Sequence, residues 1–326
     1  MRQTRQFPAY KEETPISLAP PIQATYMALP RSARRWIPNG EALLFLLFVG
    51  PNLFFFAVFS FWPIIYSAWL SFHRWDLIAP VKLYVGLDQY RYLLHDDVFH
   101  AVLRNTFVYT VGSVGGTLIL GLLVALLLNQ PLRGRDGARA VLFAPSLLSG
   151  AAISVVWIYM FDPRFGIIAR LLSLVHLASP SWLSDPAWAM PAILIVTIWK
   201  DLGFATVIFL AGLQAIPRDL YEAAKVDGAG AWWRFRSVTL PMLSPIVFFL
   251  GVTTIINTFQ SFDIIQVMTK GGPVDATNTL IYYIYQQGFV AFNAGRSSAA
   301  SLVLFMLMLG ITLLQVRYAE RKVHYG

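Results

Sequence analysis

Six long apolar runs dominate the pattern of hydrophobic and polar positions. A bilayer core about 30 Å thick needs about 20 apolar residues in a helix that rises about 1.5 Å per residue, and each run is long enough. The pattern predicts an all-α polytopic membrane protein with about six transmembrane helices. These spans are expected at about residues 42–72, 105–130, 140–161, 187–217, 241–262 and 297–316.

The rest of the chain consists of short connecting segments and a polar beginning. We expect a proline-bearing cytoplasmic tail over residues 1–40, followed by one transmembrane domain over residues 41–326. The stretch 276–295 is also uncharged, but it carries four amide side chains. It therefore favours a loop with an interfacial helix over a seventh span, with a re-entrant segment as the alternative.

The distribution of basic residues predicts the orientation. With six spans and both termini in the cytoplasm, sixteen basic residues lie on the cytoplasmic side and eight on the other. The positive-inside rule therefore favours cytoplasmic N- and C-termini. A seventh span would place the C-terminal basic residues outside.

Composition excludes several classes of function. Charged residues make up 13% of the chain, against about 25% in soluble domains, so the net charge of +8 indicates flanks of membrane spans rather than nucleic-acid binding. There are no cysteines, and the five histidines are scattered without metal-ligand spacing. Neither a P-loop nor a hydrolase motif occurs. The sequence thus predicts no catalytic, cofactor-binding or metal-binding residue, and a transport subunit rather than an enzyme.

The segment between the fourth and fifth spans, residues 216–241, carries the most specific pattern. It predicts a short helix that starts near Pro217 and stops at Gly228, with Asp219 and Glu222 in its first turns. Gly228 is expected to end the helix with a positive φ. From the residues alone, a solvated connecting helix and a docking helix are equally good interpretations.

The spacing in this segment resembles the EAA loop of bacterial ABC importer permeases. That loop has Glu-Ala-Ala, three residues, Gly, nine residues, a hydrophobic residue, any residue and Leu-Pro, matched here by Glu222, Ala223, Ala224, Gly228, Val238, Leu240 and Pro241. Downstream, the run 270–273, Lys-Gly-Gly-Pro, resembles the carbohydrate-uptake branch, and within it the first permease subunit of the maltose and glycerol-3-phosphate type. The resemblance covers about residues 40–326.

The resemblance implies a type I ABC importer permease fold in a bacterial or archaeal cell membrane. It further implies a second, different permease subunit, two cytosolic ATPase subunits that bind ATP and magnesium, and an extracytoplasmic solute-binding protein. The coupling helix that sits in a groove of one ATPase subunit would contain Glu222, Ala223, Ala224, Asp227 and Gly228. The maltose permease has a large extra extracytoplasmic domain, whereas residues 73–104 form only a small loop here, so contacts with the binding protein are not carried over.

Polar side chains inside two spans indicate a second candidate region. In the fourth span, Thr197, Lys200, Asp201 and Phe204 share one helix face. A charge at a helix centre costs about 2.5–3.5 kcal/mol, so both charges are expected to face protein or a watery cavity. Neighbours along a helix do not face each other, so each is expected to need its own partner. Structural ion pairs and the lining of a solute path both remain open.

The fifth span adds a polar stripe of Thr254, Asn257, Thr258 and Ser261, for which hydrogen bonds within the helix are the alternative. Alignment on Trp199 and on residues 271–273 places the sugar-contact positions of the maltose permease on seven residues. The resemblance thus implies a solute path lined by Thr197, Lys200, Asp201, Phe204, Thr254, Thr258 and Ser261.

The residues do not specify the solute. Residue types differ from the maltose permease at most of these positions, so a sugar is expected, or a glycerol phosphate attracted by Lys200. A polyol is the alternative within transport. A secondary transporter working without an ATPase is the alternative from another class, and it should show inverted repeats.

Overall fold

The computed structural model describes residues 40–131 and 133–322, so the predicted tail lies outside the described residues except for Gly40. The chain divides into two units at Phe54. The described part of the first unit is the apolar beginning of helix α1 (Gly40–Phe56), which contains Pro51. All further elements belong to the second unit, Phe55–Gly326.

The second unit is mostly helical in its described part, with one two-residue antiparallel strand pair. Its elements, in chain order, are η1 (Ala57–Phe61), α2 (Trp62–Leu70), β1 (His73–Arg74), β2 (Leu83–Tyr84), α3 (Asp88–His95), α4 (Asp97–Leu128), α5 (Arg135–Phe143), η2 (Ala144–Leu147), α6 (Gly150–Met160), α7 (Ile167–Leu174), α8 (Pro186–Ala215), α9 (Arg218–Val226), α10 (Ala231–Arg234), η3 (Phe235–Thr239), α11 (Leu240–Met242), α12 (Ser244–Phe259), α13 (Asp263–Met268), α14 (Leu280–Tyr285), η4 (Gln286–Val290) and α15 (Ala294–Lys322).

Within the described residues, the helices account for up to six membrane spans. Four are continuous: Leu44–Leu70, Asp97–Leu128, Pro186–Ala215 and Ala294–Arg317. Two more arise if each bent pair is one span, namely Arg135–Leu147 with Gly150–Met160, bent by 106°, and Ala231–Met242 with Ser244–Phe259, bent by 62°. The predicted all-α class with about six spans is confirmed.

The region predicted as the third span, residues 140–161, contains a sharp break that the sequence did not predict. The chain forms a 3-10 turn that contains Pro145, Leu148 adopts an extended backbone, and Ser149 caps the next helix, α6. The Ala152 N–H donates to Ser149 Oγ over 3.3 Å. An N-cap serine satisfies a free N–H at a helix start, so Pro145 and Ser149 together explain a sharp break inside an apolar run.

Small residues allow α4 and α8 to approach closely. A Cβ on Gly112 of α4 would lie 2.9 Å from Leu194 Cδ1, and one on Gly121 would lie 2.9 Å from Ala205 Cβ. Because the glycines lack a side chain, the two helix backbones can pack against each other. The long helix α8 thus becomes the central wall of the bundle.

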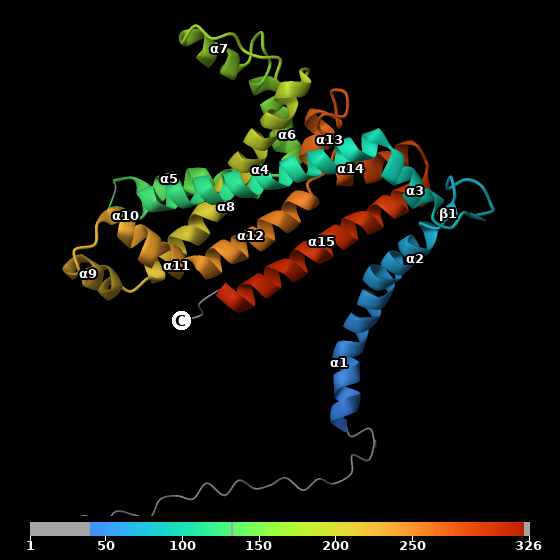
Figure 1. Cartoon of the computed structure of the whole chain (residues 1–326), viewed down its shortest axis with the longest axis horizontal. Helices are drawn as coiled ribbons and strands as arrows, with labels where there is room; N and C mark the ends of the chain where they lie inside the picture. The colour runs from blue at the N-terminus through green and yellow to red at the C-terminus, as the bar shows by residue number, and fades with distance from the viewer. Residues whose placement is uncertain (1–39, 132, 323–326) are drawn as a thin grey trace, which may run out of the picture. The chain divides into compact units, whose positions relative to one another are not determined.

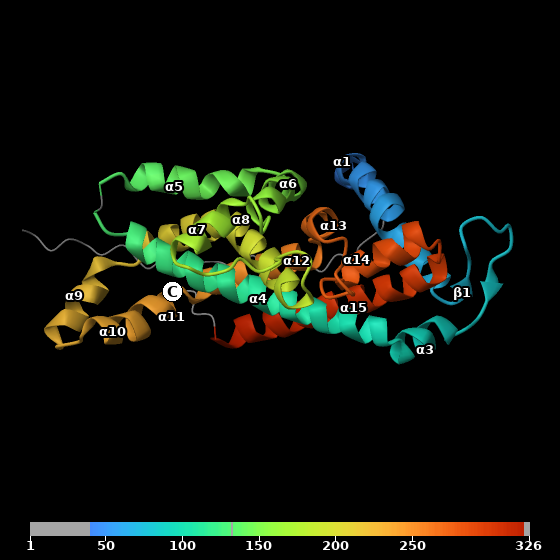
Figure 2. The same ribbon diagram turned by 90° about the horizontal axis from the view of Figure 1, so that it is seen from above.

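The bundle of the second unit has two distinct ends. Helices α9 and α10 lie at one end, whereas α3 and the strand pair lie at the other (Figures 1 and 2). Helix α12 runs between α4 and α15 and contacts both. This arrangement places the segment 216–241 far from the turn that joins α12 to α13.

Candidate functional site

Helix α9 has the boundaries that the sequence predicts. It begins directly after Pro217, and Gly228 follows its end at φ +77°. The Gly228 N–H donates to the Lys225 carbonyl over 3.0 Å, and the Ala229 N–H donates to the Ala224 carbonyl over 2.9 Å. These two bonds form a Schellman motif, which requires the left-handed backbone that glycine adopts most easily.

Most of the predicted coupling residues point away from the bundle. Among them only Ala224 is buried, whereas the others are exposed: Glu222, Ala223, Asp227 and Gly228. Nothing lies within 4 Å of the position of a Cβ on Gly228. The Tyr221 hydroxyl lies 3.0 Å from Thr239 Oγ1 and ties α9 to the segment that leads into α12. Helix α9 therefore presents Glu222, Ala223 and Asp227 to solvent, while Tyr221 attaches the helix to the bundle.

The second region consists of two adjoining hollows in the second unit, of about 310 and 330 Å³. All seven predicted path positions lie in their walls. The first hollow is lined by Thr197, Lys200, Asp201, Asn257, Thr258, Gln260, Ser261, Asp263 and Ile264. The second adds Phe204 and Thr254, together with Thr117, Phe143, Ser146, Leu147, Ala205 and Thr253, and it shares Lys200, Asp201 and Asn257 with the first.

The expectation that Lys200 and Asp201 need separate partners is wrong. Lys200 Nζ lies 3.5 Å from Asp201 Oδ1, and each side chain is 25% exposed. The Lys200 stem is long and flexible enough to bring its ammonium to the neighbouring carboxylate. The pair therefore compensates its own charge at the edge of both hollows.

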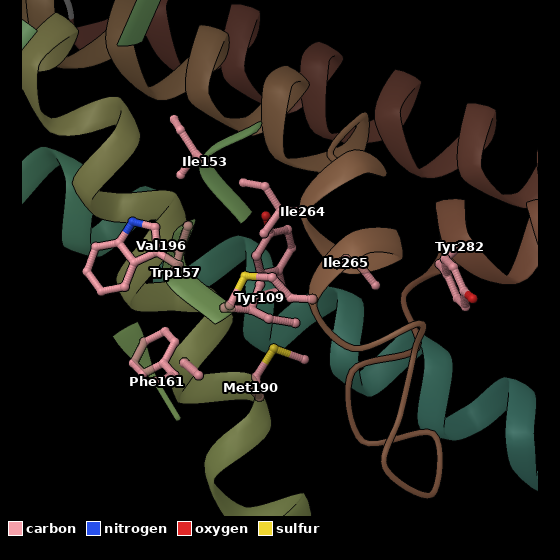
Figure 3. Close-up of a cluster of buried hydrophobic side chains, with 12 residues drawn as sticks. Tyr109, Ile153, Trp157, Phe161, Met190, Val196, Ile264, Ile265 and Tyr282 are labelled. Carbon is pink, nitrogen blue, oxygen red and sulfur yellow. The ribbon is translucent and has the colours of Figure 1, made fainter. Parts of the chain in front are cut away.

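Tyr109 of α4 connects three elements around the first hollow. Its ring is buried in an apolar cluster with residues of α6, α8 and α13 (Figure 3). Its hydroxyl donates to Ser261 Oγ over 2.8 Å and lies 3.0 Å from Thr197 Oγ1. Two predicted path residues are thus held by one tyrosine that the sequence analysis did not single out.

Hydrogen bonds within the helix, the alternative given for the polar stripe of the fifth span, are observed for Thr258, and Thr197 of α8 forms one as well. Thr197 Oγ1 donates to the Ile193 carbonyl over 3.0 Å, and Thr258 Oγ1 donates to the Thr254 carbonyl over 2.8 Å. In contrast, Thr117 Oγ1 is buried and has no hydrogen-bond partner. The hydroxyls of Thr197 and Thr258 are thus already satisfied, and that of Thr117 is enclosed by protein rather than open to the hollow.

Several lining residues were not among the seven predicted path positions. Asn257 had a signal, because it shares the polar stripe of α12. Thr117, Ser146 and Gln260 have none, since single polar residues in or near spans are ordinary. Asp263 directly follows a predicted span, where a carboxylate is common, and only the fold brings it to the hollow.

The described residues do not form a metal centre. Within residues 40–131 and 133–322, no group of three or more His, Cys, Asp or Glu side chains could hold an ion. Hydroxyls, amides, two carboxylates and one ammonium group line the hollows. Such groups form hydrogen bonds to a polar molecule and hold it in place.

A family model described as "binding-protein-dependent transport system inner membrane component" matches residues 117–324. The chain belongs to this family. The match includes α8, α9 and α12, and therefore both candidate regions of the permease. It supports the predicted ABC importer permease and not a secondary transporter.

Curated relatives resemble the permease over most of its length. The sn-glycerol-3-phosphate transport system permease protein UgpA of Yersinia pestis is 36% identical over 293 residues, which cover 89% of this chain and 96% of the relative. The protein of the same name from Brucella suis is 35% identical over 292 residues, covering 89% of this chain and 98% of the relative.

A solved structure has the same fold. A chain of a bacterial alginate ABC transporter, in complex with an alginate pentasaccharide-bound periplasmic protein, superposes with a TM-score of 0.77 at 23% identity. The match covers 90% of the permease and the whole of that chain. The likeness shows the type I importer permease fold.

Proposed function

We propose that the permease is one of two different membrane subunits of an ATP-driven importer that carries a sugar, or a glycerol-3-phosphate-type solute, into the cytoplasm. A solute-binding protein would deliver the solute from outside, and two cytosolic ATPase subunits would bind and hydrolyse ATP with magnesium. Both termini would be cytoplasmic, in a bacterial or archaeal cell membrane. The names of the relatives support the solute class.

The proposed docking site for an ATPase subunit is α9. The supporting observation is its exposure, since four of the five predicted residues are exposed to solvent. The helix also has defined ends, because Pro217 precedes it and Gly228 follows it. Glu222 would face a basic group of the ATPase, and the small alanine side chains would let the two surfaces approach. Movement of the docked helix would pass to α12 through the segment 229–243.

The combination of Glu222→Lys with Gly228→Pro tests the docking. Proline cannot adopt the positive φ of Gly228, and the lysine reverses the charge offered to the ATPase. We expect solute-stimulated ATP hydrolysis by the reconstituted importer to be lost while the permease still inserts. Asp88→Lys, an exposed charge reversal at the opposite end of the bundle, should leave it unchanged. Normal stimulation in the double variant would contradict the proposal.

The proposed solute path runs through the two hollows. The supporting observation is that seven positions from α8, α12 and the residue Ser261 line adjoining spaces that share Lys200 and Asp201. The chain has no cysteine of its own, so single cysteines at 254, 258 and 261 can be probed with a water-soluble thiol reagent. Labelling that solute blocks supports the path. Unreactive cysteines together with lost assembly would mean that these positions are core.

A further inference from the structure

The charges around the two hollows are unequal. Lys200 provides the one cation of their walls, and Asp201 and Asp263 provide two carboxylates. Lys200 already pairs with Asp201 at 3.5 Å. Within the residues that the structure describes, Asp263 forms no ion pair. The walls that this chain contributes therefore carry an excess of one negative charge.

Asp263 is held in place by the break in the third span. Its Oδ1 accepts a hydrogen bond from the Ile264 N–H over 2.9 Å. Its carboxylate also lies against Gly150, the first residue of α6, so closely that a Cβ on Gly150 would overlap it. The N-terminal end of a helix favours a negative charge. The protein's own carboxylate thus takes the place beside α6 where an anion would otherwise be favoured.

The other groups that face the hollows suit hydroxyls. Asn257 and Gln260 are exposed amides in the wall of the first hollow. Amides and hydroxyls both donate and accept hydrogen bonds, as solute hydroxyls do.

We infer that the path admits an uncharged, polyhydroxylated solute and disfavours phosphorylated or carboxylated ones, with Asp201 and Asp263 as specificity-determining residues. This inference rests on the proposed function and narrows its solute class. A phosphate entering the first hollow would meet Asp263, a carboxylate that has no cationic partner among the described residues, and such like-charge contacts disfavour a ligand. Lys200 cannot offset the repulsion of a phosphate by Asp263, because its ammonium is already paired with Asp201.

Charged thiol reagents measure the charge preference of the hollows directly in the assembled importer. Asn257→Cys places a single cysteine in the wall shared by both hollows. Its reaction rates with a trimethylammonium methanethiosulfonate and with a sulfonate methanethiosulfonate are each divided by the rate with a small thiol in solution. We expect the cationic reagent to be favoured by about tenfold, since a charged cleft concentrates counter-ions by about 10-fold or more.

Three further substitutions in the Asn257→Cys background assign the preference to the named charges. Asp263→Asn should lower the ratio of the cationic to the anionic rate several-fold. Lys200→Gln, which leaves two carboxylates and no ammonium, should raise this ratio. Asp88→Asn removes the same charge from exposed α3 and should leave the ratio unchanged. Because Lys200→Gln acts in the opposite direction, a folding defect of one variant cannot imitate the result.

The outcomes separate this inference from the proposed function. A normalised anionic rate equal to or above the cationic one, or protection of the cysteine by sn-glycerol 3-phosphate, would overturn the inference and leave the path intact. A cysteine that reacts with neither reagent would overturn both the inference and the proposed solute path, because position 257 would then not be accessible to water.

Discussion

Helix α9 and the two hollows are built in opposite ways. Residues 217–229 contain the features that begin and end α9, Pro217 at its start and the Schellman bonds at its end, with the exposed Glu222 between them. The hollows instead take their walls from α4, α5, η2, α8, α12, the segment after α12 and α13. A substitution in a site contained in one segment affects that segment alone, whereas one in a site made by several helices can also affect how those helices pack.

The largest expected effect on stability comes from a substitution where α8 packs against the backbone of α5. A Cβ on Gly203 of α8 would overlap the Leu142 carbonyl of α5, which is backbone and cannot rotate away. We expect Gly203→Ala to destabilise the permease by about 3 kcal/mol, at the upper end for overpacked cores. The fall in the thermal unfolding midpoint of the purified protein measures it.

Gly251 of α12 provides the matched control for Gly203→Ala. Nothing lies within 4 Å of the position of a Cβ on Gly251, so Gly251→Ala should leave the unfolding midpoint unchanged or slightly raised. Equal midpoints for the two variants would show that α5 and α8 do not pack as described.

A smaller effect is expected from Asp201→Asn. The change leaves the Lys200 ammonium without its partner at 3.5 Å. Loss of one member costs about 3–5 kcal/mol for a buried pair and at most about 1 kcal/mol for a surface pair, so we expect about 2 kcal/mol for this partly exposed one. Lower uptake together with a lower yield of assembled complex would be observed. Unchanged yield with lost uptake would show that the pair has no structural role.

The same contrast explains how far the sequence could be read. The ends of α9 could be predicted from Pro217 and Gly228, because these residues restrict their own backbone. The six membrane spans could be predicted from the length of the apolar runs alone. The break at Ser149 was missed because hydrophobicity does not report backbone direction. Tyr109 and Asp263 could not be found, since their roles arise only when helices distant in sequence meet.

Lys200 and Asp201 show a limit of a different kind. Their position on one face of α8 together with Thr197 and Phe204 was predicted from helical spacing, and both line the hollows. Their pairing was not, because the rule that helix neighbours do not face each other describes Cβ directions. A side chain as long as lysine can reach around the helix surface, so the rule does not hold for its terminal amine.

Tyr109→Phe tests how strongly the three elements around the first hollow are joined. The change removes a hydroxyl that contacts Ser261 and Thr197 and keeps the buried ring. An unsatisfied buried hydroxyl costs about 1–3 kcal/mol, and we expect about 1.5 kcal/mol from the unfolding midpoint. Tyr159→Phe, on an exposed tyrosine of α6, is the control. If both substitutions have the same effect, Tyr109 does not hold the hollow together.

The smallest change in stability is expected at α9, where function should nevertheless respond. Gly228 has φ +77°, and a non-glycine residue in the left-handed region costs about 1 kcal/mol. Because this segment is exposed, Gly228→Ala should fray the end of α9 and reduce solute-stimulated ATP hydrolysis several-fold, while the unfolding midpoint of the bundle stays within about 1 kcal/mol of the original. Gly230 has φ −65°, which alanine adopts without strain, so Gly230→Ala should reduce neither quantity. A Gly228→Ala variant that lowers the unfolding midpoint as much as Gly203→Ala would show that α9 is part of the bundle's core and not a separate docking element.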